Sequence, residues 1–74
     1  MKRISKEDLE KLRTEYPVGT RVKLIKMDDP YNMSLQPGET GTVLFVDDIG
    51  TIHVKWDSGS TLGIVYGEDM CQKV

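Results

Sequence analysis

The spacing of apolar residues changes at Pro17, and this change constrains the fold more than any other feature of the sequence. Before it, Leu9, Leu12 and Tyr16 fall on one helical stripe, because residues three or four apart share a face of a helix. After it, short runs rich in β-branched residues are separated by Gly, Pro and Asp, which is typical of strands joined by tight turns. The chain is therefore predicted to be mainly β, with one N-terminal α-helix over residues 1–16 and a small five-stranded barrel over residues 17–74.

The predicted helix has recognisable ends. Ser5, followed by Asp8 three residues later, is suited to cap a helix that begins near Lys6. Tyr16 precedes Pro17, and the residue before a proline disfavours helical backbone, so the helix is expected to end there. A helix of about ten residues is unstable alone in water, so its apolar stripe must pack on the rest of the chain. Residues 43–46 are apolar on both faces, and we expect one face to meet the core and the other to meet this stripe.

Five runs are predicted as strands, over residues 20–26, 41–47, 51–57, 61–65 and 71–74. Asp and Gly residues between the second, third and fourth runs favour tight hairpins, because both tolerate the backbone angles of short turns. Gly63 inside the fourth run indicates a bend that lets the sheet curl and close. Trp56 alternates with apolar neighbours and is predicted to lie in the core rather than to serve as an exposed stacking platform. The long loop between the first two strands favours a functional role.

The length of 74 residues fits a single domain, residues 1–74, with a thin core. Cys71 is the only cysteine, so no internal disulfide is possible, and burial as a small apolar residue is expected for it. No run of about 18 apolar residues is present to span a membrane, and a cytoplasmic location is expected. No cofactor and no metal site is predicted, because no loop has the ligand spacing of a recognisable calcium site.

The order of elements over residues 18–74 resembles that of SH3-like barrels, in particular the PGETGTV segment at 37–43 and the VKWDSGS hairpin at 54–60. The whole chain resembles more closely a small family, domain of unknown function number 4314, found in Gram-positive bacteria, their phages and mobile elements. The segments that carry this resemblance are ISKE at 4–7, YPVGTRV at 16–22, MDDPY at 27–31 and IHVKWD at 52–57. The resemblance implies an SH3-like fold and a bacterial or phage origin, and it assigns no functional residues.

Acidic pairs and two tyrosines occur in loops that flank one groove in SH3-like barrels. An acidic, aromatic-lined groove is suited to a basic or extended peptide, because carboxylates pair with Arg or Lys and aromatic rings accept extended chains. The alternative is that the acidic residues only form solvated turns. The predicted function is a non-catalytic adaptor that binds an unidentified protein or basic peptide. The candidate peptide-binding residues are Asp28, Asp29, Tyr31, Asp47, Asp48 and Tyr66.

A second hypothesis is a nucleic-acid-associated module that uses basic residues of the helix and the first strand, namely Lys6, Arg13, Arg21 and Lys23. The net charge of −2 disfavours it, since phosphate contacts supply most of such affinity. An enzyme is disfavoured because no catalytic nucleophile and base pair is recognisable around His53, the only histidine. The sequence does not predict an oligomeric state.

Overall fold

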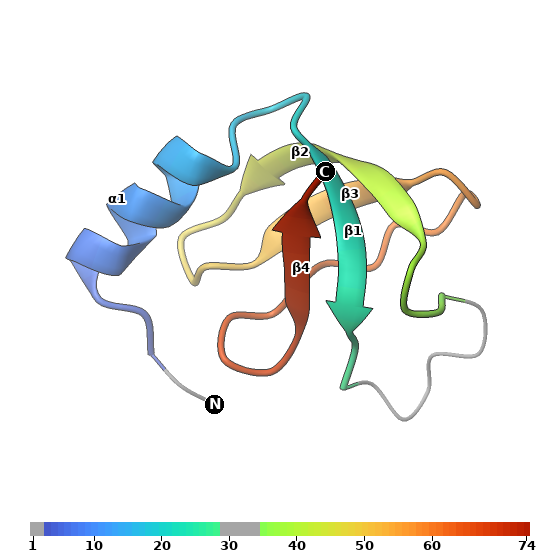
Figure 1. Cartoon of the computed structure of the whole chain (residues 1–74). Helices are drawn as coiled ribbons and strands as arrows, with labels where there is room; N and C mark the ends of the chain where they lie inside the picture. Colours follow the sequence, from blue (N-terminus) through green and yellow to red (C-terminus); the bar gives the residue numbers. More distant parts are fainter. Residues whose placement is uncertain (1–2, 29–34) are drawn as a thin grey trace.

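The computed structural model describes residues 3–28 and 35–74, and it consists of one helix and one antiparallel sheet (Figure 1). The strands are ordered β3-β2-β1-β4 across the sheet. The elements in chain order are α1 (Lys6–Glu15), β1 (Arg21–Lys26), β2 (Thr40–Val46), β3 (Ile52–Trp56) and β4 (Met70–Lys73). The described ranges contain no helix that could cross a bilayer.

The ends of α1 lie where the sequence predicts them. The Ser5 hydroxyl oxygen accepts a hydrogen bond of 3.1 Å from the main-chain N–H of Asp8, which satisfies one of the unpaired donors at the helix start. Tyr16 caps the other end, where its N–H donates to the carbonyl of Leu12 over 2.9 Å. The helix is thus held by local contacts at both ends, immediately before Pro17.

The prediction of five strands is wrong for the described residues, which form four. Residues 61–65 make only an isolated bridge between Ile64 and Ile52. The reason is that the Trp56 indole N–H donates to the carbonyl of Leu62 over 2.8 Å, so this carbonyl bonds a side chain rather than a neighbouring strand. The sheet remains open in the described residues, with β3 and β4 at its two edges, and the predicted barrel closure is not seen.

The second face of β2 does not meet the helix as predicted. The pairing of β2 with β3 shifts between Val43 and Phe45, which makes Leu44 an extra, bulged residue. Val43 and Val46 consequently both point into the core, while the Leu44 and Phe45 side chains are 42 % and 53 % exposed. A single inserted residue therefore places two apolar side chains on the face of the sheet that is turned away from the core.

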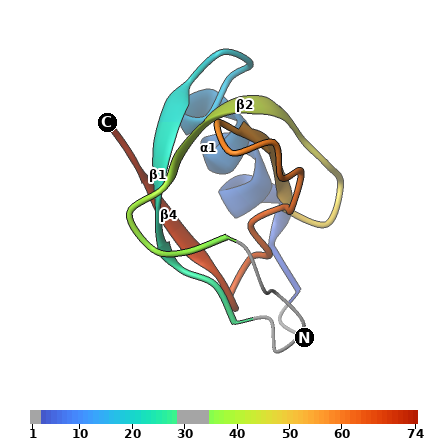
Figure 2. The ribbon, with the colours of Figure 1, turned by 90° about the vertical axis from the view of Figure 1, so that its right-hand side faces the viewer.

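The core lies inside the curl of the sheet, and α1 packs against that same inner side. Figure 2 shows the curvature of the strands, and Figure 1 shows α1 beside one end of the curved sheet. The stripe of Leu9, Leu12 and Tyr16 contacts the core, which confirms that the helix docks through it. Trp56 is 1 % exposed, which confirms its predicted place in the core. The buried apolar residues are Val22, Leu24, Leu35, Val43, Val46, Ile52, Val54, Trp56 and Ile64.

Candidate binding groove

An open cavity of about 400 Å³ lies between α1, β4 and the turn over residues 65–69, and we refer to it as the groove. Leu12 and Tyr16 line it from the helix, and Ile52 and Ile64 line it from the core. These residues give the groove an apolar floor because the inner side of the curled sheet is incompletely covered by one short helix. The groove is therefore a direct consequence of the open sheet.

The rim of the groove is formed by the turn that leads into β4. Tyr66 and Glu68 line the groove from this turn, and Met70 and Cys71 line it from β4. Tyr66 is half-buried and Glu68 is exposed, and the described residues contain no ion pair that involves Glu68. The rim thus presents an aromatic ring, a thioether and an unpaired carboxylate beside an apolar floor. Lys26 of β1, which is also in no ion pair with a described residue, lines the groove as well.

Asp69 shapes this turn. Its carboxylate accepts hydrogen bonds from the N–H of Val65 over 2.9 Å and from the N–H of Asp28 over 2.8 Å. The N–H groups of Glu68 and Asp69 both donate to the carbonyl of Val65. Asp69 consequently fixes the rim and ties it to the chain that follows β1, so its oxygens serve the fold.

The predicted peptide-binding residues are only partly brought together. Tyr66 lines the groove, and Asp28 lies beside the rim through its hydrogen bond to Asp69. Asp29 and Tyr31 lie outside the described residues. Asp47 and Asp48 belong to the turn between β2 and β3, and neither lines the groove.

The carboxylate of Asp47 organises the β2–β3 turn. It accepts hydrogen bonds from the N–H of Thr51 over 2.8 Å and of Ile49 over 3.2 Å, and it lies 2.9 Å from Nε2 of His53. Burial acts to raise the pKa of Asp47, but the hydrogen bonds from His53 and the two main-chain groups outweigh it and lower this pKa. Asp47 therefore stays ionised as a structural group of the hairpin.

Asp48 is paired with the helix. Arg13 donates to its carboxylate over 2.7 Å and to the carbonyl of Val46 over 3.4 Å, which joins α1 to the β2–β3 turn. Because the Asp48 side chain is 95 % exposed, this ion pair contributes little to stability. Its consequence is that Asp48 and Arg13 partly neutralise each other, so neither offers its full charge to a ligand.

Of the other basic residues in the nucleic-acid hypothesis, Arg21 is also engaged. Its guanidinium donates two hydrogen bonds, of 2.8 and 2.6 Å, to the carboxylate of Asp57 and further bonds to Thr40 and Thr42. The hydrogen bonds from Arg21 and Thr40 hold the pKa of Asp57 well below its usual range. Lys6 and Lys23 take part in no ion pair within the described residues.

A stacked pair on the outside of the sheet was not expected from the sequence. The Phe45 and His53 rings lie 4.2 Å apart with an interplanar angle of 11°. The bulge at Leu44 turns Phe45 outward, opposite His53 in the register of β2 and β3. The alternation of apolar residues carries no signal for this pair, because a bulge reverses the face of every residue beyond it.

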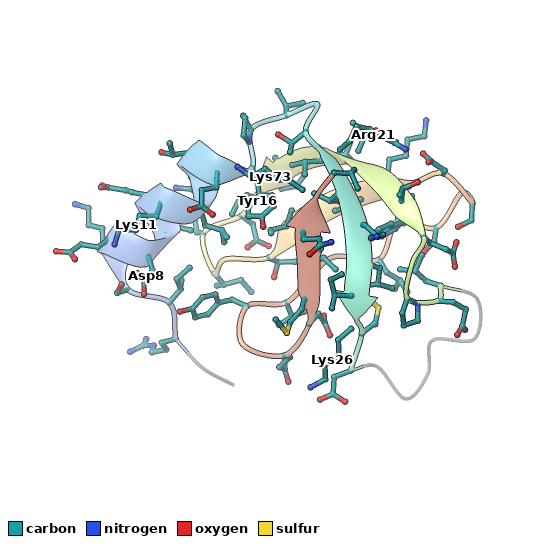
Figure 3. The ribbon with its side chains drawn as sticks, viewed as in Figure 1. Asp8, Lys11, Tyr16, Arg21, Lys26 and Lys73 are labelled. Atoms are coloured by element: carbon teal, nitrogen blue, oxygen red, sulfur yellow. The ribbon has the colours of Figure 1, made fainter. Side chains whose placement is uncertain are left out.

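Cys71 is a thiol rather than a reactive thiolate. Partial burial raises its pKa to about 11, although a hydrogen bond with Tyr16 opposes this shift. The Nζ of Lys73 lies 5.8 Å from the centre of the Tyr16 ring, so Tyr16 joins the end of α1 to β4 (Figure 3). Within residues 3–28 and 35–74, no group of three His, Cys, Asp or Glu side chains is placed to hold a metal ion.

Comparison with known proteins places the chain in a family. No curated protein and no solved structure matches it. The match to the family covers residues 5–74, which spans the helix, all four strands and the groove. The chain belongs to the family described as Domain of unknown function (DUF4314).

Proposed function

We propose that the chain is a non-catalytic binding module of bacterial or phage origin, with an SH3-like arrangement of strands, that binds a basic, extended segment of a partner protein. The observation that carries this proposal is the groove, which combines an apolar floor with Tyr66 and the unpaired Glu68 at its rim. Its volume of about 400 Å³ falls within the range, roughly 300–1,000 Å³, of cavities that bind ligands. An apolar floor takes aliphatic side chains, and the carboxylate selects Arg or Lys.

The proposed binding surface contains only some of the peptide-binding residues that the sequence predicts. Tyr66 and Asp28 remain at the rim, while Glu68 replaces Asp47 and Asp48 as the source of free negative charge. Asp29 and Tyr31 stay predictions, as does the identity of the partner. Residues 17–74 carry five basic and eight acidic residues, and this excess of negative charge favours a basic partner.

The surroundings of the Cys71 thiol and the His53 imidazole, the side chains considered for catalysis, support a non-catalytic role. The thiol of Cys71 has a raised pKa, which keeps it protonated near neutral pH. The Nε2 of His53 is bound to Asp47, and no Ser, Thr or Cys side chain within the described residues hydrogen-bonds to the imidazole. A nucleophile with an adjacent base, the arrangement that covalent catalysis needs, is not assembled around either group.

We expect Tyr66→Ala to weaken binding of a basic peptide at least tenfold, because Tyr66 lines the groove and tyrosine is one of the residue types enriched at binding hot spots. Peptides from an Arg- and Lys-rich library are titrated into the labelled protein, and chemical-shift changes give the Kd. Thermal unfolding of the variant is measured alongside, and Tyr66→Phe, which keeps the ring, is expected to retain most of the affinity.

Phe45→Ala is the matched control, since Phe45 is an exposed aromatic residue outside the groove. It is expected to leave the Kd unchanged. Equal losses in folded Tyr66→Ala and Phe45→Ala proteins, or shifts centred on residues of β2 and β3, would exclude the groove as the binding surface.

One observation favours a second candidate, a single-stranded nucleic acid bound on the outer face of the sheet. The exposed Phe45–His53 stack lies on the same sheet as the unpaired Lys23 and Lys55, and aromatic rings beside cations bind unpaired bases and their phosphates. This candidate predicts binding of oligothymidine at low salt that weakens roughly tenfold between 50 and 200 mM salt. Phe45→Ala would then weaken binding, and fluorescence anisotropy that shows no binding at low salt would rule the candidate out.

A further inference from the structure

The edge strand β4 has main-chain groups directed away from the sheet. Val74, the residue after β4, donates its N–H to the carbonyl of Arg21 over 3.1 Å. Residue pairs in an antiparallel ladder alternate between hydrogen-bonded and non-hydrogen-bonded pairs. Since Val74 and Arg21 form a bonded pair, the pairs Lys73–Val22 and Cys71–Leu24 are non-bonded ones. The N–H and C=O groups of Cys71 and Lys73 therefore point to the side opposite β1.

That side of β4 borders the groove. No Cα atom of α1 lies within 8 Å of a Cα atom of β4, so the backbone of the helix does not cover the strand edge. Met70 and Cys71 line the groove from β4, and Tyr16 lines it from the end of α1. Within the described residues no segment hydrogen-bonds to the main chain of Cys71 or Lys73.

A strand added to a sheet lies about 4.8 Å from its neighbour and bonds to it through alternate residues. The space beside β4 is bounded by an apolar floor, and every second side chain of an added strand would point into that floor. Glu68, at the end of β4 where the chain enters from the turn, is placed to pair with a cation on the same segment.

We propose that the partner segment binds by β-strand addition, pairing its main chain with Cys71 and Lys73 while apolar side chains enter the groove and an Arg or Lys side chain pairs with Glu68. This inference rests on the proposed function and adds the mode of recognition to it. Lys26, Glu68 and Asp69 are the charged residues that line the groove, so its lining has one more negative than positive charge. The occupant is an extended, basic segment of another protein, because residues 17–74 carry eight acidic and five basic residues and the groove lining is negative on balance. Strand addition supplies affinity from the main chain and leaves specificity to the alternating side chains.

Amide hydrogen exchange tests this directly, because the proposal predicts an alternating pattern. With a saturating peptide of alternating valine and arginine residues, exchange of the Cys71 and Lys73 amides is expected to slow at least tenfold. The Gln72 and Val74 amides, which face β1, are expected to change little. A peptide methylated on the nitrogens that face β4 is expected to bind at least tenfold more weakly than one methylated on the other nitrogens.

The failures of this inference and of the proposed function are distinguishable. Binding that depends on Tyr66 but leaves the Cys71 and Lys73 amides unchanged would overturn strand addition while the groove remains the binding surface. A peptide that does not bind at all would overturn both. A dimer in sedimentation, with the Cys71 and Lys73 amides already protected in the protein without peptide, would identify a second copy as the occupant and overturn the basic partner.

Discussion

Trp56→Ala is expected to cost about 3–5 kcal/mol of unfolding free energy, as other large-to-small aromatic substitutions in cores do. The side chain is 1 % exposed, and its indole N–H holds the carbonyl of Leu62. A chain of 74 residues at about 0.05–0.15 kcal/mol per residue has about 4–11 kcal/mol of stability in total. The variant should therefore be largely unfolded or should unfold at a much lower urea concentration, which urea titration followed by circular dichroism measures.

Two further variants separate the contributions of Trp56. Trp56→Phe keeps most of the apolar volume and removes the hydrogen bond to Leu62, so it is expected to cost less than Trp56→Ala and to loosen residues 61–65 selectively. Phe45→Ala removes a ring that is 53 % exposed and is expected to cost less than about 1 kcal/mol. A loss below about 1 kcal/mol for Trp56→Ala would show that Trp56 does not organise the core.

Gly41→Ala is expected to cost about 3 kcal/mol, the upper end of the range for overpacking. A Cβ atom at Gly41 would lie 2.7 Å from Cγ1 of Val54, 2.9 Å from the carbonyl oxygen of Lys55 and 2.9 Å from Cα of Trp56. Two of these three atoms belong to the backbone of β3, so β2 and β3 would have to separate to admit the methyl group. Denaturant unfolding gives the free energy, and amide exchange in β2 and β3 locates the disturbance.

Gly59→Ala is the matched control for this substitution. A Cβ atom there would meet nothing within 4 Å, but the φ of +100° disfavours any side chain, and the expected cost is about 1–2 kcal/mol. The loss of unfolding free energy in Gly41→Ala therefore reports steric contact, whereas the loss in Gly59→Ala reports backbone strain. If Gly41→Ala were no more destabilising than Gly59→Ala, the close approach of β2 and β3 at this position would be refuted.

Trp56→Ala and Gly41→Ala are also expected to affect the groove. Trp56 and Val54 lie in the core, which contains the floor residues Ile52 and Ile64. A variant that loosens this core is expected to lose peptide binding together with stability. Tyr66→Ala, by contrast, is expected to lose peptide binding while the core stays folded. The core variants therefore test whether binding depends on the packing beneath the groove, and Tyr66→Ala tests whether it depends on the contact of one side chain.

Much of the fold follows from short-range signals in the sequence. The Ser5 cap and Pro17 bound the helix, because capping and the restriction before proline act within a few residues. Alternation of Ile52, Val54 and Trp56 predicts the inward face of β3, because successive side chains of a strand point to opposite sides. These features can be predicted from the sequence because each depends only on residues that are close together in the chain.

The tertiary structure decides the features that depend on partners far apart in the chain. The bulge at Leu44 arises from the pairing of β2 with β3, and it sends Phe45 outward against the pattern. Arg13 removes Asp48 from the expected acidic rim through an ion pair between residues 35 positions apart. The Trp56 indole donates its hydrogen bond to the carbonyl of Leu62, and residues 61–65 form no strand of the sheet. No local pattern specifies which carbonyl a buried donor will reach, so only the tertiary structure could decide this feature.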